Sequence, residues 1–249
     1  MSLCGVIPAA GRGARLGFSK PKLLVPVTDT LTIWDVLKRK MMEVCDHIVV
    51  VMSPWGEPHL REVLAHDPDA VRISVVIQPE PIGMGDAVMR GVPVWENYDD
   101  ICVIWGDQLH VSRQTLEACK AQQESMVQPR MTLPLAAMDQ PYVEYRFDKA
   151  GRLLTILQSR EGDACAPGGW GDIGTFFLST KNLSSAWESY AQHAPRGRKT
   201  NEVNFLPFLI YLSQTNWNLA HIAIADADEA KGINDQNDLA YFLQLYNKP

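Results

Sequence analysis

The chain has 249 residues, of which 46% are hydrophobic and 21% charged, and its formal net charge is −6. This composition is ordinary for a folded globular protein, and we predict a single α/β domain over 1–249. The negative net charge argues against a nonspecific nucleic-acid binder, which needs a broad basic face.

Short apolar runs alternate with amphipathic stretches of helical length, which is typical of a parallel-dominated sheet covered on both faces. The predicted strands are 4–8, 47–52, 73–77, 101–105, 173–178 and 217–225. The predicted helices are 32–44, 57–65, 85–92, 113–124, 182–193, 203–213 and 235–246. We therefore expect a doubly wound, Rossmann-like α/β fold with a mixed, mostly parallel sheet.

The segment 131–175 departs from this alternation. A turn at 148–151 separates two β-type runs, 142–147 and 153–157, which predicts a hairpin. We expect a small β-ribbon there, with 162–171 as a mobile loop over a substrate pocket.

The most distinctive segment follows the first predicted strand. Residues 9–22 contain Gly11 and Gly13 and four cations, which are Arg12, Arg15, Lys20 and Lys22. Glycines let backbone N–H groups approach phosphate oxygens closely, and the cations supply countercharge worth roughly 4 kcal/mol per pair at about 4 Å in an effective dielectric near 20. This loop predicts a polyphosphate site, whereas the alternative is a surface turn with solvated cations.

Two common phosphate-binding motifs do not fit this loop. The dinucleotide pattern G-x-G-x-x-G fails because Leu16 stands where the third glycine is required, and the Walker pattern G-x-x-x-x-G-K-[ST] is absent from the loop. The loop therefore indicates a nucleoside triphosphate that is bound without a P-loop.

These residues resemble the signature of the nucleotidyltransferases, or pyrophosphorylases, which join a nucleoside triphosphate to a sugar phosphate or related phosphate ester. That signature, A-A-G-x-G-[TS]-R-[LM]-x(n)-P-K, corresponds to 9–16 followed by Pro21-Lys22, with Ala14 at the usual hydroxyl position. Further segments similar to the family follow in its order, at 78–87, 103–107, 201–202 and 232–239. The closest similarity is to the uridylyltransferase domain acting on N-acetylglucosamine 1-phosphate.

The resemblance implies roles for individual residues. Arg15 would face the β and γ phosphates and Lys22 the α-phosphate, and with Asp107 they form the expected catalytic set. The expected nucleotide-binding residues are Ala9, Ala10, Gly11, Arg12, Gly13, Gln78, Gly83 and Met84. Because Met84 replaces a hydroxyl residue near the base, UTP, dTTP and CTP all remain candidate substrates.

A magnesium ion is the expected cofactor. Asp107 ends the apolar run 101–105, and Mg²⁺ prefers hard oxygen ligands, usually one or two carboxylates together with substrate phosphates. The resemblance adds Asn234 as a second ligand. A nearby acidic cluster either lends another ligand or forms a solvated loop or helix cap; it consists of Asp226, Asp228 and Glu229.

The expected acceptor-binding residues are Gln158, Asp172, Gly174, Asn201 and Glu202. Gln158 stands where the sugar-transferring relatives place a Glu, and Asp172 stands where they place an Asn. These exchanges change which groups donate and accept hydrogen bonds, so the acceptor is either a different sugar phosphate or a non-sugar phosphate ester.

The expected reaction is a single in-line displacement at the α-phosphorus with release of pyrophosphate, in which the protein positions and neutralises its substrates. One alternative is a cytidylyltransferase for a phosphoalcohol of a surface polymer. Another is a nonenzymatic nucleotide-sensing module on the same fold.

The remaining features concern location. The five cysteines lack C-x-x-C spacing, which fits a reducing cytoplasm, and we find neither an export leader nor an apolar stretch of about 18 residues that would span a membrane. We therefore expect a cytoplasmic protein without a nucleic-acid or membrane partner. Its oligomeric state is open, a homo-oligomer included.

Overall fold

The computed structural model describes residues 1–11 and 16–246, so Arg12, Gly13 and Arg15 lie outside the described residues. The strands are β1 Leu3–Pro8, β2 His47–Met52, β3 Ile73–Ile77, β4 Asp100–Ile104, β5 Arg130–Met138, β6 Val143–Phe147, β7 Leu153–Gln158, β8 Gly169–Asp172, β9 Thr175–Ser179 and β10 Asn218–Ile224. The helices are α1 Ile33–Met42, α2 Glu57–Leu64, α3 Met84–Arg90, α4 Val92–Trp95, α5 Arg113–Ser125, α6 Leu183–Ala191, α7 Phe205–Ser213 and α8 Gln236–Tyr246. Short 3₁₀ turns include Lys22–Leu24, Ser159–Glu161 and Ala227–Ala230.

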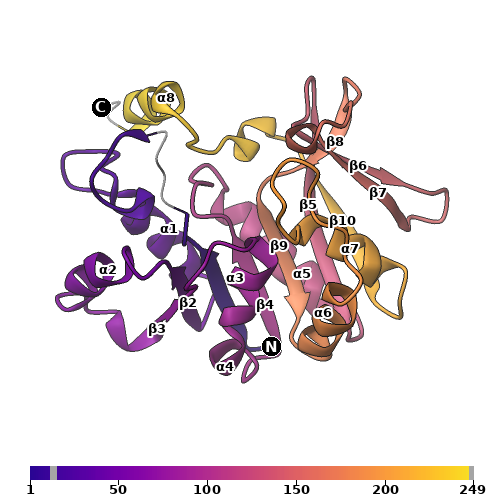
Figure 1. The fold of residues 1–249 in the computed structure, drawn as a ribbon, viewed down its shortest axis with the longest axis horizontal. Coiled ribbons are helices and arrows are strands. Elements are labelled where there is room, and N and C mark those ends of the chain that lie inside the picture. Colours follow the sequence, from indigo (N-terminus) through magenta and orange to yellow (C-terminus); the bar gives the residue numbers. More distant parts are fainter. Residues whose placement is uncertain (12–15, 247–249) are drawn as a thin grey trace.

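All these strands form one sheet in the order β3-β2-β1-β4-β9-β5-β8-β6-β7, with β10 on the other side of β5 (Figure 1). β1 pairs in parallel with both β2 and β4, and β2 pairs in parallel with β3. From β9 onward the sheet is mixed, since β9 runs antiparallel to β4. The prediction of a mixed, Rossmann-like α/β fold is confirmed.

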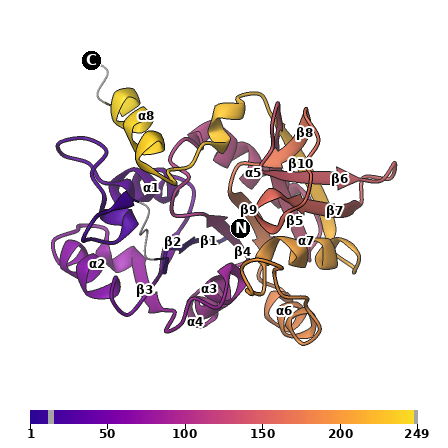
Figure 2. The same cartoon turned by 45° about the horizontal axis from the view of Figure 1, so that its top comes forward.

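Helices cover both faces of the sheet (Figure 2), because the buried strands are apolar on both sides. Along β1, Leu3 and Ile7 enter one core, whereas Cys4 and Val6 enter the other. The first core receives side chains from α1, α2, α5 and α8, and the second from α3, α4, α6 and α7. The described residues include no helix long and apolar enough to cross a membrane.

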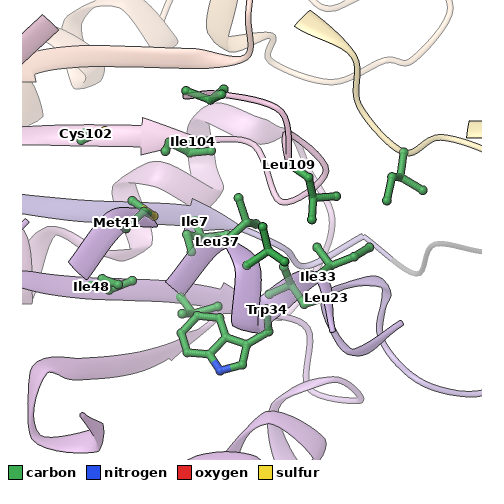
Figure 3. Packing of buried hydrophobic residues seen from close by; sticks show 14 of the residues in the cluster. Ile7, Leu23, Ile33, Trp34, Leu37, Met41, Ile48, Cys102, Ile104 and Leu109 are labelled. Carbon is green, nitrogen blue, oxygen red and sulfur yellow. The ribbon is translucent and has the colours of Figure 1, made fainter. Parts of the chain in front are cut away.

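Helix α1 begins at a capping box. Thr32 Oγ1 accepts a hydrogen bond from the backbone N–H of Asp35, and the Asp35 carboxylate accepts one from the backbone N–H of Thr32 at 2.8 Å. Its apolar face packs Trp34, Leu37 and Met41 into the first core (Figure 3). This fixed helix supports the turn Lys22–Leu24 on one side and the loop after β4 on the other.

The predicted hairpin is present as the antiparallel pair β6–β7, which projects from one end of the sheet (Figure 1). Two strands of the same region, β5 and β8, were not predicted. β8 occupies the end of the segment 162–171 that we expected to be a loop, and it pairs with β5. The ribbon therefore continues the main sheet, because β6 pairs with β8.

A buried ion pair joins β4 to β5. Asp100 is fully buried and accepts hydrogen bonds from Arg130 Nη2 at 2.7 Å and Nε at 3.2 Å, from Gln123 Nε2 at 2.5 Å and from Ser179 Oγ at 3.3 Å. Because Asp100 and its partners are buried, removing the charge of Asp100 would leave the Arg130 charge buried without a counter-charge.

We predict that Asp100→Ala lowers the free energy of unfolding by about 3–5 kcal/mol, the usual cost of an uncompensated buried charge. Urea unfolding followed by circular dichroism measures this change. Arg113→Ala is the control, because Arg113 forms its ion pairs with Glu43 and Glu117 on the exposed surface. An equal loss of unfolding free energy in the two variants would contradict the conclusion that the Asp100–Arg130 ion pair stabilises the fold.

Candidate functional site

Two adjoining cavities lie beyond the carboxyl ends of β1 and β4. From β1 the chain adds β2 and β3 on one side of the sheet, whereas β4 lies on the other side of β1. The strand order therefore reverses between β1 and β4, which is the usual ligand position in such sheets. The cavities have volumes of about 320 and 310 Å³, and we call them the first and second cavity. Both are lined by Met84, Trp105, Asp107, Arg160 and Glu202.

The first cavity brings together most of the residues expected to bind a nucleotide. It is lined by Ala9, Ala10, Gly11, Lys22, Gln78, Gly83 and Met84. The expected residues Arg12, Gly13 and Arg15 belong to the undescribed part of the same loop. After that gap the chain is fixed to α8, because the carbonyl of Leu16 accepts a hydrogen bond from Gln236 Nε2.

Lys22 and Asp107 meet where the two cavities adjoin. Lys22 Nζ lies 2.9 Å from Asp107 Oδ2, and each side chain is about one-quarter exposed or less. Lys22 opens a 3₁₀ turn beside α1, while Asp107 follows β4 after Trp105 and Gly106. A cation and a carboxylate from distant segments are thus held at one point of the cleft.

Gln78 is buried at the end of β3, in the wall of the first cavity. Its Nε2 donates to the Gly83 carbonyl at 3.0 Å and to Asp86 Oδ2 at 2.9 Å, and Asp86 is itself paired with Arg90 at 3.1 Å. Because these contacts occupy the amide nitrogen, the Oε1 atom remains to accept a hydrogen bond from a ligand. Asp86 therefore positions Gln78, a role that the sequence did not predict.

Gly83 lies against the segment 194–204, which we call the strap. Its φ of 139° favours glycine, and a Cβ there would lie 2.7 Å from the Val203 carbonyl oxygen and 3.4 Å from Glu202 Cβ. The close approach places Glu202 in the wall of both cavities. The strap is tied down by Glu161, which accepts hydrogen bonds from the Lys199 N–H and Thr200 Oγ1, both at 2.8 Å. The first of these bonds is the main cause of the lowered pKa of the Glu161 carboxyl.

Three of the expected acceptor-binding residues, Gln158, Asp172 and Glu202, line the second cavity. Burial raises the pKa of the Asp172 carboxyl, which accepts a hydrogen bond from the Gly174 N–H at 2.8 Å. Gly174 lines neither cavity but leaves room for Gln108, since a Cβ there would collide with the Gln108 side chain. Asn201 also lines neither cavity, and its carbonyl accepts a hydrogen bond from Arg196 Nη1.

Arg160 is a residue that sequence reasoning missed. It follows β7 in a 3₁₀ turn and lines both cavities. Its guanidinium makes no hydrogen bond or ion pair with any residue that the structure describes. Although its charge acts on the neighbouring Glu161 carboxylate, the guanidinium has no direct partner among the described residues and can pair with an anionic ligand at the boundary of the two cavities. Nothing in the local sequence distinguishes it from the other arginines of the ribbon.

Asp107 and Asn234 have the chemistry of a magnesium site. The Ile233 N–H donates to the Asp107 carbonyl at 3.1 Å, which brings the next residue, Asn234, into the same cavity wall. A carboxylate and an amide oxygen suit Mg²⁺, and the ammonium on Asp107 Oδ2 shows that this atom attracts a cation. Within 1–11 and 16–246, no three His, Cys, Asp or Glu side chains form a metal-binding group, so substrate phosphates would complete the coordination.

The acidic cluster formed by Asp226, Asp228 and Glu229 makes contacts with other residues of the protein. Asp226 caps the turn Ala227–Ala230, Asp228 pairs with Lys231 at 2.8 Å, and Glu229 accepts hydrogen bonds from the Ser112 N–H and Thr115 Oγ1. These contacts correspond to the capping alternative.

The fold and the cleft define a class of α/β protein whose ligand position is the switch point of its sheet. Comparison with known proteins gives the family. Residues 5–202 match the MobA-like NTP transferase domain, so the chain belongs to that family, and the predicted resemblance to the nucleotidyltransferases is confirmed.

Similar proteins include several named "Bifunctional protein GlmU". The one from Synechococcus sp. (strain JA-3-3Ab) is 27% identical over 98% of this chain and 38% of its own length. Those from Francisella philomiragia and Coxiella burnetii (strain CbuG_Q212) are 34% and 30% identical, over 47% and 65% of this chain and 24% and 34% of their own lengths. The chain thus spans well under half the length of these curated relatives.

We predict that Gly83→Ala weakens nucleotide binding, because the new Cβ would strain the backbone and push the strap from the first cavity. Isothermal titration with a nucleoside triphosphate measures the affinity, and trypsin cleavage at Arg198 or Lys199 reports release of the strap. Gly151→Ala is a matched control, since Gly151 also has a positive φ of 80°, but a Cβ there would meet no atom within 4 Å and the residue lines neither cavity. Unchanged affinity in Gly83→Ala would remove Gly83 from the site.

Proposed function

We propose that this protein transfers a nucleotidyl group from a nucleoside triphosphate to a sugar 1-phosphate or related phosphate ester and releases pyrophosphate. The observation that carries the proposal is the junction of two cavities at the Lys22–Asp107 pair, with Arg160 in both walls. Membership of the NTP transferase family supports it.

The first cavity suits the nucleotide. Gln78 offers its Oε1 atom to a hydrogen-bond donor of the base. In uracil and thymine this donor is the ring N3–H, and in cytosine it is the amino group. Gly11 and Lys22 also line this cavity and would contact the triphosphate, as the phosphate-binding loop implies. We also propose that Arg12, Gly13 and Arg15, in the same loop, contact the triphosphate.

The second cavity suits an acceptor with many hydroxyl groups. Gln158, Asp172 and Asn204 offer hydrogen bonds, whereas Met138 and Phe205 form an apolar wall. A sugar presents both hydroxyls and a C–H face, so this lining supports a sugar phosphate over a short phosphoalcohol.

In the proposed reaction, a phosphate oxygen of the acceptor attacks the α-phosphorus, a new P–O bond forms, and the bond from that phosphorus to the β-bridging oxygen breaks. Pyrophosphate leaves with the electron pair of the broken bond. Lys22 and Arg160 hold the reacting phosphates in line and offset their negative charge. Mg²⁺ bound by Asp107 and Asn234 would supply further charge stabilisation.

Lys22 holds the charge of Asp107 in the free protein. Asp107 and Asn234 would hold the cation, which would supply positive charge beside the phosphates. With Asp107 engaged in this way, the Lys22 ammonium would be free to pair with the α-phosphate.

The test is exchange of radiolabelled pyrophosphate into each nucleoside triphosphate, with and without Mg²⁺ and with a panel of acceptor phosphates and nucleotide products. We expect exchange with a pyrimidine nucleotide, and a 10²–10⁴-fold lower turnover in Lys22→Met, because that variant loses a charge near the reacting phosphate. Lys22→Met should also bind Mn²⁺ more tightly than wild type without nucleotide, since Asp107 is then unpaired. Absence of exchange under all conditions favours a nonenzymatic nucleotide sensor.

We predict that Arg160→Met raises the KM for the acceptor by about 10- to 100-fold, the loss expected for a charge-assisted hydrogen bond of ~1.5–3 kcal/mol. Steady-state kinetics at saturating triphosphate measures this effect. Arg152→Met is the control, because Arg152 lies on the same ribbon but is paired with Asp148 at the hairpin turn. An equal KM in the two variants would show that Arg160 does not contact the acceptor.

A further inference from the structure

Lys40 is a partly buried cation that the proposed reaction does not use. It lies in the last turn of α1, and its Nζ donates to the Leu109 carbonyl at 2.5 Å and to the Val111 carbonyl at 2.8 Å. Both carbonyls belong to the loop 107–111, which begins with Asp107. One ammonium therefore bridges two points of the loop that carries the expected metal ligand.

The ammonium is held there at a cost to the protein. Burial lowers the pKa of Lys40 to about 8, although the carboxylates of Glu229 and Glu43 act in the opposite direction. An apolar side chain at this position would avoid that cost of desolvation. The two hydrogen bonds to the loop carbonyls offset this cost, so the charge is tied to the position of the loop.

The same helix also supports the other side of the cleft. The Ile33 N–H at the start of α1 donates to the Val25 carbonyl at 3.0 Å, directly after the turn that carries Lys22. Leu23, Ile33, Leu37 and Leu109 belong to one core, and Figure 3 shows them gathered between the helix and the loop. Helix α1 thus contacts both the segment that carries Lys22 and the loop that carries Asp107.

Other contacts also hold the loop, among them the hydrogen bond from the Ile233 N–H to the Asp107 carbonyl at 3.1 Å. Tyr246 Oη donates to the Leu109 carbonyl at 3.3 Å, and His110 Nδ1 lies 2.9 Å from the Asp228 carbonyl. The described contacts of the Val111 carbonyl include no side-chain donor other than Lys40. Loss of Lys40 would thus remove the shorter of the two side-chain hydrogen bonds to the Leu109 carbonyl and the described side-chain hydrogen bond to the Val111 carbonyl, and so loosen the loop that carries Asp107.

We propose that Lys40 is a positioning residue, which fixes the 107–111 loop in the form in which the Asp107 carboxylate receives a divalent cation. The inference rests on the proposed function for the identity of the metal site. Residues that hold a metal ligand in place typically change metal affinity 10- to 100-fold when they are replaced, although they never touch the metal.

The test compares Lys40→Met, Lys40→Arg and Lys120→Met. Lys120 is a matched control, because its Nζ also donates to a backbone carbonyl, that of Val44 at 3.1 Å, which follows α1 and is not part of the 107–111 loop. Binding of Mn²⁺ to the protein without nucleotide or pyrophosphate, which chelate the ion themselves, is measured from the loss of the free-ion EPR signal and does not require turnover.

We expect Lys40→Met to weaken Mn²⁺ binding at least tenfold, Lys40→Arg to restore most of the affinity, and Lys120→Met to bind as wild type does. The Mg²⁺ concentration for half-maximal exchange should rise in parallel, while the KM for triphosphate at saturating Mg²⁺ stays the same. If Lys40→Met does not fold, as judged by circular dichroism, Lys40→Gln takes its place, because it keeps a hydrogen-bond donor without the charge.

Wild-type affinity for Mn²⁺ in Lys40→Met, or equal losses in Lys40→Met and Lys120→Met, would overturn the inference. Failure of the proposed function gives a different result. In that case no triphosphate exchanges even in the wild-type protein, whereas Mn²⁺ binding still reports whether Lys40 controls the site.

Discussion

The cleft depends on one constraint, which is the parallel pairing of β1 with both β2 and β4. This pairing places the ends of β1 and β4 side by side, so the segments after them share one opening. Lys22 and Asp107 are 85 residues apart in the chain and still meet at 2.9 Å. Helix α1 contacts both segments. Its first turn lies against the Lys22 segment, and its last turn lies against the loop that begins with Asp107.

The sequence predicted the parts of the fold that follow regular patterns. All six predicted strands and all seven predicted helices overlap elements of the structure, because each has a continuous apolar run or a clear helical period. β5 was missed since Pro134 lies in its middle, where proline usually argues against a strand, and it is held by neighbours on both sides. β8 was missed because two of its four residues are glycine. Its pairing with β5 is a tertiary effect that no local pattern encodes.

The site shows the same limit. Lys22, Gln78, Asp107 and Glu202 lie within recognisable motifs, and the structure places all four in the cavity walls. Arg160 and Lys40 lie outside those motifs, and their importance comes from what surrounds them: a cavity boundary for one and two backbone carbonyls for the other. Asn201 lies within a motif, yet its carbonyl contacts Arg196 and it lines neither cavity.

If the protein catalyses the proposed transfer, the shared wall of the two cavities has a consequence for the end of the catalytic cycle. A joined product would fill both cavities as a single molecule, so it loses its translational freedom only once, whereas the two substrates lose theirs separately. Unless the strap or the ribbon yields, such a product leaves slowly. Departure of the product, rather than bond formation, would then limit turnover, and accumulated product would compete with both substrates at once.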